Sequence, residues 1–157
     1  IIAGSRTLVA ALKHEPLFRA LRCDKLILSA LEATVDAYLR GESGVAILEM
    51  LRVTNEDLRV RAERMIAALD GLPLAARVGP GRAQVGGGTL PRSVIPSLTV
   101  DLVHRTLKPQ ELATRLREQA IPLIGYIARG ALKLDLRTIF PRQDQDVVRA
   151  IRAAAAP

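Results

Sequence analysis

The chain has 157 residues, of which 49% are hydrophobic and 25% are charged, and its formal net charge is +7. This length and apolar content predict one domain, or one domain with an appended piece, whose core is built from aliphatic residues because Trp is absent. The apolar runs are much shorter than the roughly 20 residues that span a bilayer, which argues against a membrane protein. A single cysteine, Cys23, excludes an internal disulfide, and with no visible signal peptide it favours a cytoplasmic protein.

The positive charge is carried mainly by arginine. It favours a polyanionic partner such as RNA or a phosphorylated ligand. An arginine-rich composition of the whole genome would explain it equally well, because the arginines are scattered and no aromatic residues lie between them to stack on bases.

The first residues have the pattern of a β-strand that begins before residue 1. Residues 1–4 predict a short apolar strand that ends at a glycine, and Ser5 is expected to cap a helix over residues 6–13. The chain begins without Met, so we expect a fragment of a longer protein in which a functional site is only partly present. Next come Arg19 and Arg22, which can converge on one anion if the backbone there is helical or tightly turned.

An amphipathic helix is predicted over residues 25–40, because its apolar positions recur with a period near 3.6. Asp24 is the expected N-cap of this helix and Gly41 its expected stop. Residues 44–51 predict a further helical turn or two.

The next helix is expected to begin at Asn55 and to end at Gly71. Three arginines on it, Arg59, Arg61 and Arg64, are expected to form its solvated face. Its predicted buried stripe consists of Leu58, Ala62, Met65, Ile66 and Leu69.

From residue 74 the pattern changes to a period of two, which is typical of strands. The predicted elements are a strand at 76–78, a turn at Gly79-Pro80-Gly81, a strand around 97–102, a helix opened by Lys108-Pro109, strands at 121–128 and 132–136 joined by Arg129-Gly130, and a last helix from Pro141. In the strand around 97–102, Leu98, Val100 and Leu102 are expected on one face and Ser97, Thr99 and Asp101 on the other. The run Ala153–Ala156 is expected to fray.

Residues 55–157 therefore predict an α+β sandwich with an antiparallel sheet and helices packed mainly on one face. Two histidines and one cysteine cannot form a structural zinc site, so no metal is expected. The stretch Gln84-Val85-Gly86-Gly87-Gly88 could bring backbone N–H groups close to an anion, or it could be a flexible turn between strands. Cys23 fits an inert residue better than a nucleophile.

Three motifs together resemble the bacterial L-seryl-tRNA(Sec) selenium transferases, the selenocysteine synthases. They are Pro16–Leu26 continuing through Ala30–Thr34, Gln84–Pro91, and Asp135–Thr138, in matching order and spacing. The resemblance covers the whole chain as the C-terminal third or so of the family's length. The chain departs from the common pattern at Cys23, where the family often has Val, and at Ala83, where a polar residue is usual.

The resemblance implies a fold-type-I (aspartate aminotransferase-like) pyridoxal 5'-phosphate enzyme that converts seryl-tRNA(Sec) to selenocysteyl-tRNA(Sec) with selenophosphate. Residues 1–54 would be the end of the cofactor-binding large domain plus a linking helix, and residues 55–157 the small C-terminal domain. The family forms a ring-shaped homo-oligomer built of dimers. Its cofactor lysine lies upstream of this chain, so the chain alone is expected to be inactive.

For the site, the resemblance implies that Arg19 and Arg22 are catalytic residues that meet the phosphate of selenophosphate. Asp24 would cap the following helix or orient an arginine. The glycine motif, with Gln84, Gly86, Gly87 and Gly88, would lie at the mouth of the active site. Two alternatives stay open: a related pyridoxal phosphate lyase or transferase acting on a small amino acid or amino sugar, and a non-catalytic RNA-binding or assembly module.

Overall fold

The computed structural model describes residues 2–41, 45–86 and 93–156. The chain divides into two compact units, Ile1–Val45 and Ala46–Pro157. None of the described helices is long and apolar enough to cross a membrane.

The first unit contains α1 (Arg6–His14), the 3-10 helix η1 (Pro16–Leu21) and α2 (Lys25–Leu39). The helices are those expected, but the Ser5 side chain makes no capping hydrogen bond. The predicted strand at residues 1–4 is wrong for its described part: Ile2 and Ala3 are not in a strand. A strand requires a neighbouring strand to satisfy its backbone groups, and the described residues of this unit form none.

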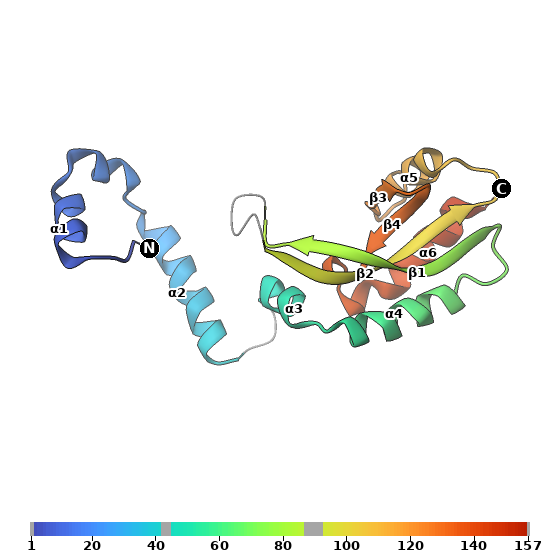
Figure 1. The fold of residues 1–157 in the computed structure, drawn as a ribbon, viewed down its shortest axis with the longest axis horizontal. Helices are drawn as coiled ribbons and strands as arrows, with labels where there is room; N and C mark the ends of the chain where they lie inside the picture. Colours follow the sequence, from blue (N-terminus) through green and yellow to red (C-terminus); the bar gives the residue numbers. More distant parts are fainter. Residues whose placement is uncertain (1, 42–44, 87–92, 157) are drawn as a thin grey trace. The chain divides into compact units, whose positions relative to one another are not determined.

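The second unit begins with α3 (Ala46–Arg52) and α4 (Asn55–Ala67) and continues through β1 (Leu74–Gln84), β2 (Val94–His104), α5 (Pro109–Arg117), β3 (Tyr126–Ala128), β4 (Ala131–Asp135) and α6 (Asp144–Ala155) (Figure 1). Two 3-10 turns, η2 (Leu136–Thr138) and η3 (Pro141–Gln143), lie between β4 and α6. The four strands form one antiparallel sheet in the order β1-β2-β4-β3. The α+β architecture and the order helix, strand, strand, helix, strand, strand, helix are confirmed from α4 onward.

The core lies between one face of the sheet and helices α4, α5 and α6. Leu58, Leu112 and Ile151 from the three helices are fully buried with Val100, Leu102, Leu132 and Leu134 from β2 and β4. The expected stripe of α4 is confirmed, and so is the alternation of β2, whose even-numbered residues 98 to 102 face this core. Ser97, Thr99 and Asp101 of β2 lie on the other face, and these polar side chains are buried as well.

The turn predicted at Gly79-Pro80-Gly81 is wrong, because β1 runs straight through it. Pro80 is tolerated because β1 is an edge strand, in which a missing N–H can point away from the sheet. The two glycines are needed for close approach. A Cβ added to Gly79 would lie 2.3 Å from Asp101 Oδ2, and one added to Gly81 would lie 3.1 Å from Asp135 Oδ2.

The prediction that Arg61 lies on a solvated face is also wrong, since its side chain is only 11% exposed. Its guanidinium donates to both carboxylate oxygens of Asp144, at 2.6 and 3.0 Å, and to the carbonyls of Leu136 and Ile139. Arg59 and Arg64 are exposed, as expected.

Two further expectations fail near the end of the chain. Of residues 121–128 only Tyr126–Ala128 form a strand, although Arg129 and Gly130, with φ of 53° and 73°, make the expected hairpin turn. The Ala153–Ala156 run does not fray, because Ala154 and Ala155 are buried and Arg115 Nη1 donates to the carbonyls of Ala154 and Ala156.

Candidate anion-binding site

The arginine stretch is a 3-10 turn. Pro16 opens η1 at its first position, and the N–H of Arg22 bonds to the carbonyl of Arg19 at 3.3 Å. Arg19 lies in the last turn of η1, and Arg22 is its C-cap, where the backbone becomes extended. The condition stated for convergence on one anion, a tightly turned backbone, is therefore met between the two arginines.

Apolar residues of η1 and α1 lie close together. Phe18 and Leu21 line a cavity of about 320 Å³ together with Val9 and Leu12 of α1. The side chains of Arg19 and Arg22 are exposed. Within the described part of the chain, neither guanidinium has a side-chain hydrogen bond or an ion pair.

Asp24 caps α2, as predicted: its Oδ1 accepts a hydrogen bond from the N–H of Ile27 at 2.8 Å. Among the described residues it makes no ion pair with Arg19 or Arg22, so the carboxylate serves the helix rather than either arginine. The carboxylate of Asp24 offsets the positive end of the α2 dipole at this helix start. The two guanidinium groups are therefore the feature of this stretch that favours an anion.

The glycine motif lies in the second unit, apart from the arginines in the chain. Gln84 is the last residue of β1, paired with Val94, and is exposed. Gly86 has φ of +75°, a left-handed conformation that favours glycine. Gly87 and Gly88 lie outside the described residues. The structure therefore gives the setting of Gln84 and Gly86 at the end of a β-hairpin and leaves their predicted role as a prediction.

Sequence reasoning missed a buried polar cluster on the face of the sheet that is turned away from α4, α5 and α6. Lys133 Nζ lies 2.6 Å from both carboxylate oxygens of Asp101, and the Thr99 hydroxyl donates to Asp101 Oδ1 at 2.6 Å. Burial raises the pKa of the nearby Tyr126 hydroxyl, and the negative charges of Asp135 and Asp101 raise it further. Alternating polar residues in β2 were the available signal, but alternation predicts a solvated face and not a buried ion pair.

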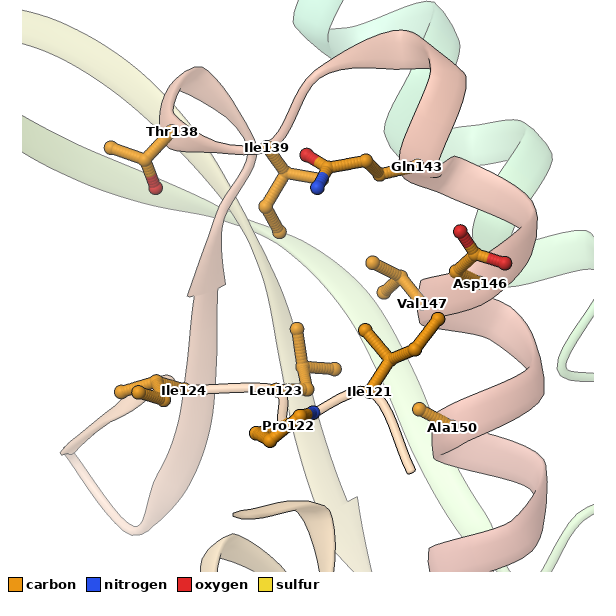
Figure 2. Close-up of a pocket in the computed structure, with 10 residues that line it drawn as sticks. All are labelled: Ile121, Pro122, Leu123, Ile124, Thr138, Ile139, Gln143, Asp146, Val147 and Ala150. Carbon is orange, nitrogen blue, oxygen red and sulfur yellow. The ribbon is translucent and has the colours of Figure 1, made fainter. Parts of the chain in front are cut away.

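A cavity of about 240 Å³ lies between residues 121–124 and α6. Figure 2 shows Ile121, Leu123, Ile139 and Val147 turned toward one another around it. Its one charged lining residue, Asp146, forms an ion pair with Arg149. The cavity therefore offers apolar contact and no catalytic group. Among residues 2–41, 45–86 and 93–156, no group of three or more His, Cys, Asp or Glu side chains is placed to hold a metal ion.

Comparison with known proteins agrees with the motifs. A family model described as L-seryl-tRNA selenium transferase matches residues 1–140. Curated relatives with the name L-seryl-tRNA(Sec) selenium transferase include those of Geobacter sulfurreducens (37% identical, 99% of this chain and 35% of the relative), Moorella thermoacetica (40%, 96% and 33%) and Escherichia coli (38%, 91% and 33%). The chain thus spans about a third of the length of the relatives it matches.

Proposed function

Because the chain belongs to the L-seryl-tRNA selenium transferase family, we propose that it is the C-terminal part of an enzyme that converts seryl-tRNA(Sec) to selenocysteyl-tRNA(Sec). Selenophosphate is the proposed selenium donor. The names of the relatives support the tRNA substrate. We further propose a ring-shaped homo-oligomer of dimers and a cytoplasmic location, as the family resemblance implies.

One observation carries the role of this chain in that reaction: Arg19 and Arg22 flank one tight turn, exposed and without side-chain partners among the described residues. Paired guanidinium groups bind phosphate-like oxygens bidentately and keep their charge at any physiological pH. We assign them the task of holding the phosphate of selenophosphate.

Pyridoxal 5'-phosphate is proposed for the full-length enzyme, where it would act as an electron sink for the seryl group. As the family resemblance implies, we propose that the cofactor lysine lies in the part of the enzyme upstream of this chain.

The fold-type-I assignment places residues 1–54 at the end of the cofactor-binding large domain and its linking helix, and residues 55–157 in the small C-terminal domain. The α+β sheet of the second unit supports this division. Helix α3 belongs with the second compact unit, since Arg137 binds the carbonyls of Met50 and Val53. The linking element proposed here is thus α2, and α3 joins the small domain.

The test is selenium transfer to seryl-tRNA(Sec) by the full-length enzyme, or by the Geobacter sulfurreducens relative with its matching third replaced by this chain. We expect Arg19→Ala and Arg22→Ala each to lower kcat/KM for selenophosphate roughly ten- to a hundredfold, the value of one charged hydrogen bond of about 1.5–3 kcal/mol. The matched control is Arg59→Ala, an exposed arginine on α4, which should leave kcat/KM unchanged. If both site variants keep full activity, the anion-site assignment is wrong.

The alternatives have their own readouts. A lyase or transferase for small amino acids would act on free L-serine or an amino sugar and would not need tRNA. An RNA-binding module would show tight, salt-sensitive binding of tRNA(Sec) by this chain alone in a filter-binding assay.

A further inference from the structure

The hairpin of β1 and β2 extends beyond the rest of the sheet. Only Thr99–Leu102 of β2 pair with β4, whereas Arg82–Gln84 and Val94–Pro96 pair with each other. These six residues are here called the arm, and Figure 1 shows it projecting past β4. A two-stranded hairpin is only marginally stable by itself, so other contacts must fix the direction of the arm.

Arg137 makes such a contact. Its Nη2 donates to the carbonyl of Pro96 at 2.8 Å, and its Nη1 donates to the carbonyls of Met50 and Val53 at 2.9 and 2.8 Å. Nη2 also lies 3.3 Å from Asn55 Oδ1. The guanidinium thereby joins the arm to the segment where α3 ends and α4 begins.

The burial of this side chain shows how closely it is fitted. Arg137 is only 7% exposed, and its Nε is buried with no hydrogen-bond partner among the described residues. A buried donor without a partner is unfavourable in free energy. We infer that the hydrogen bonds made by the two Nη groups of Arg137 offset this cost. A second set of hydrogen bonds also joins β2 to the Arg137 segment. The Ser97 hydroxyl donates to Asp135 Oδ1 at 2.6 Å, and this oxygen also accepts from the backbone N–H of Arg137.

We propose that Arg137 is a positioning residue that aims the arm, and with it Gln84 and Gly86, from the α3–α4 segment. Its planar fork can donate to three carbonyls at once, which the single ammonium of a lysine cannot match in geometry. The set of hydrogen bonds by which Arg137 holds the arm is here called the clamp. The link from the clamp to selenium transfer rests on the proposed function, whereas the clamp itself rests on these contacts alone.

The first experiment uses the full 157-residue chain and hydrogen–deuterium exchange. In Arg137→Lys and Arg137→Ala, amides of the arm and of α3 should exchange at least about tenfold faster, while those of α5 keep their protection. Arg61→Lys and Arg61→Ala are the matched controls, because Arg61 is a similarly enclosed arginine that binds two carbonyls and Asp144 but not the arm. Arg137→Lys retains the charge and serves if Arg137→Ala does not fold. Unchanged exchange in the arm, or equal acceleration by the Arg61 variants, would overturn the clamp.

The second experiment measures selenium transfer by the full-length enzyme. Arg137→Lys should lower kcat/KM about tenfold or more at a temperature where it is as fully folded as Arg61→Lys, which should keep its activity. An arm that loosens without loss of activity would refute the link to catalysis and leave the clamp established. Failure of the proposed function would instead appear as no selenium transfer by the unaltered enzyme, with the exchange result intact.

Discussion

Replacing Gly79 with alanine should destabilise the second unit more than any surface change in β1. The added Cβ would lie 2.3–2.5 Å from three atoms of the Asp101 carboxyl group. That group cannot simply swing away, because Lys133 Nζ holds both of its oxygens at 2.6 Å and Thr99 donates to one of them. Relief of the clash therefore requires the buried ion pair to open.

The magnitude follows from that requirement. Opening a buried ion pair that leaves a charge unpaired costs about 3–5 kcal/mol. With a urea m-value of roughly 1–3 kcal/mol/M, the midpoint of unfolding should fall by about 1–5 M. The graded control is Gly81→Ala, whose Cβ would lie 3.1 Å from Asp135 Oδ2 and Thr99 Cγ2, and which should cost much less.

A double-mutant cycle decides whether the cause is the carboxylate. In an Asp101→Ala background the clashing group is absent, so Gly79→Ala should add less than about 1 kcal/mol to the destabilisation. Urea unfolding followed by far-UV circular dichroism measures all four variants. Equal costs of Gly79→Ala with and without Asp101 would refute the reasoning, as would a Gly79→Ala midpoint equal to that of the unaltered chain.

Two further predictions concern single groups. Thr54→Ala removes one half of the capping box at the start of α4, in which Asp57 Oδ2 also accepts from the Thr54 hydroxyl and N–H; we expect a loss of about 1 kcal/mol in urea unfolding. The same hydrogen bonds lower the pKa of Asp57, so the stability it contributes is present above its ordinary pKa and is lost as pH falls through the lower folded value. An NMR titration should show the pKa of Asp57 rising in Thr54→Ala, and an unchanged pKa would contradict the assignment. For Tyr126, burial and then Asp135 and Asp101 raise the pKa, so its contribution to stability is present below the ordinary tyrosine pKa of about 10 and is lost as pH rises through the folded value. Tyr126→Phe should therefore show a smaller loss of stability between about pH 9 and 11 than the unaltered chain, and an identical loss would rule out Tyr126 as its source.

The regular elements were predictable because local patterns and burial agree there. The 3.6-residue period of α4 and the alternation of β2 each match the face that the structure buries, whereas the apolar residues of α2 predicted its helix but are exposed. Asp24 marks the start of α2 by a capping hydrogen bond, and Gly41 and Gly130 mark element ends by a positive φ that glycine adopts without strain. The backbone between Arg19 and Arg22 is tightly turned, which is the condition that the sequence analysis set for the two arginines to converge on one anion.

The errors arise where a residue type has two uses. Gly79-Pro80-Gly81 is typical of a turn, yet here the glycines make room for carboxylates from β2 and β4, and proline fits an edge strand. The carboxylates come from positions more than 20 residues along the chain, so no local window contains the reason.

Arginine is the residue whose two uses matter most for function. In the second unit Arg137, Arg115 and Arg152 donate to carbonyls at the C-terminal ends of α3, α6 and α4. Helix ends of this kind have carbonyls without intrahelical partners and a negative partial charge, so a cation there stabilises the fold. Part of the +7 charge is thereby structural, and the compositional case for an RNA-binding module weakens. The case for Arg19 and Arg22 does not depend on composition, because these two exposed arginines flank one tight turn and their guanidinium groups bind no helix end among the described residues.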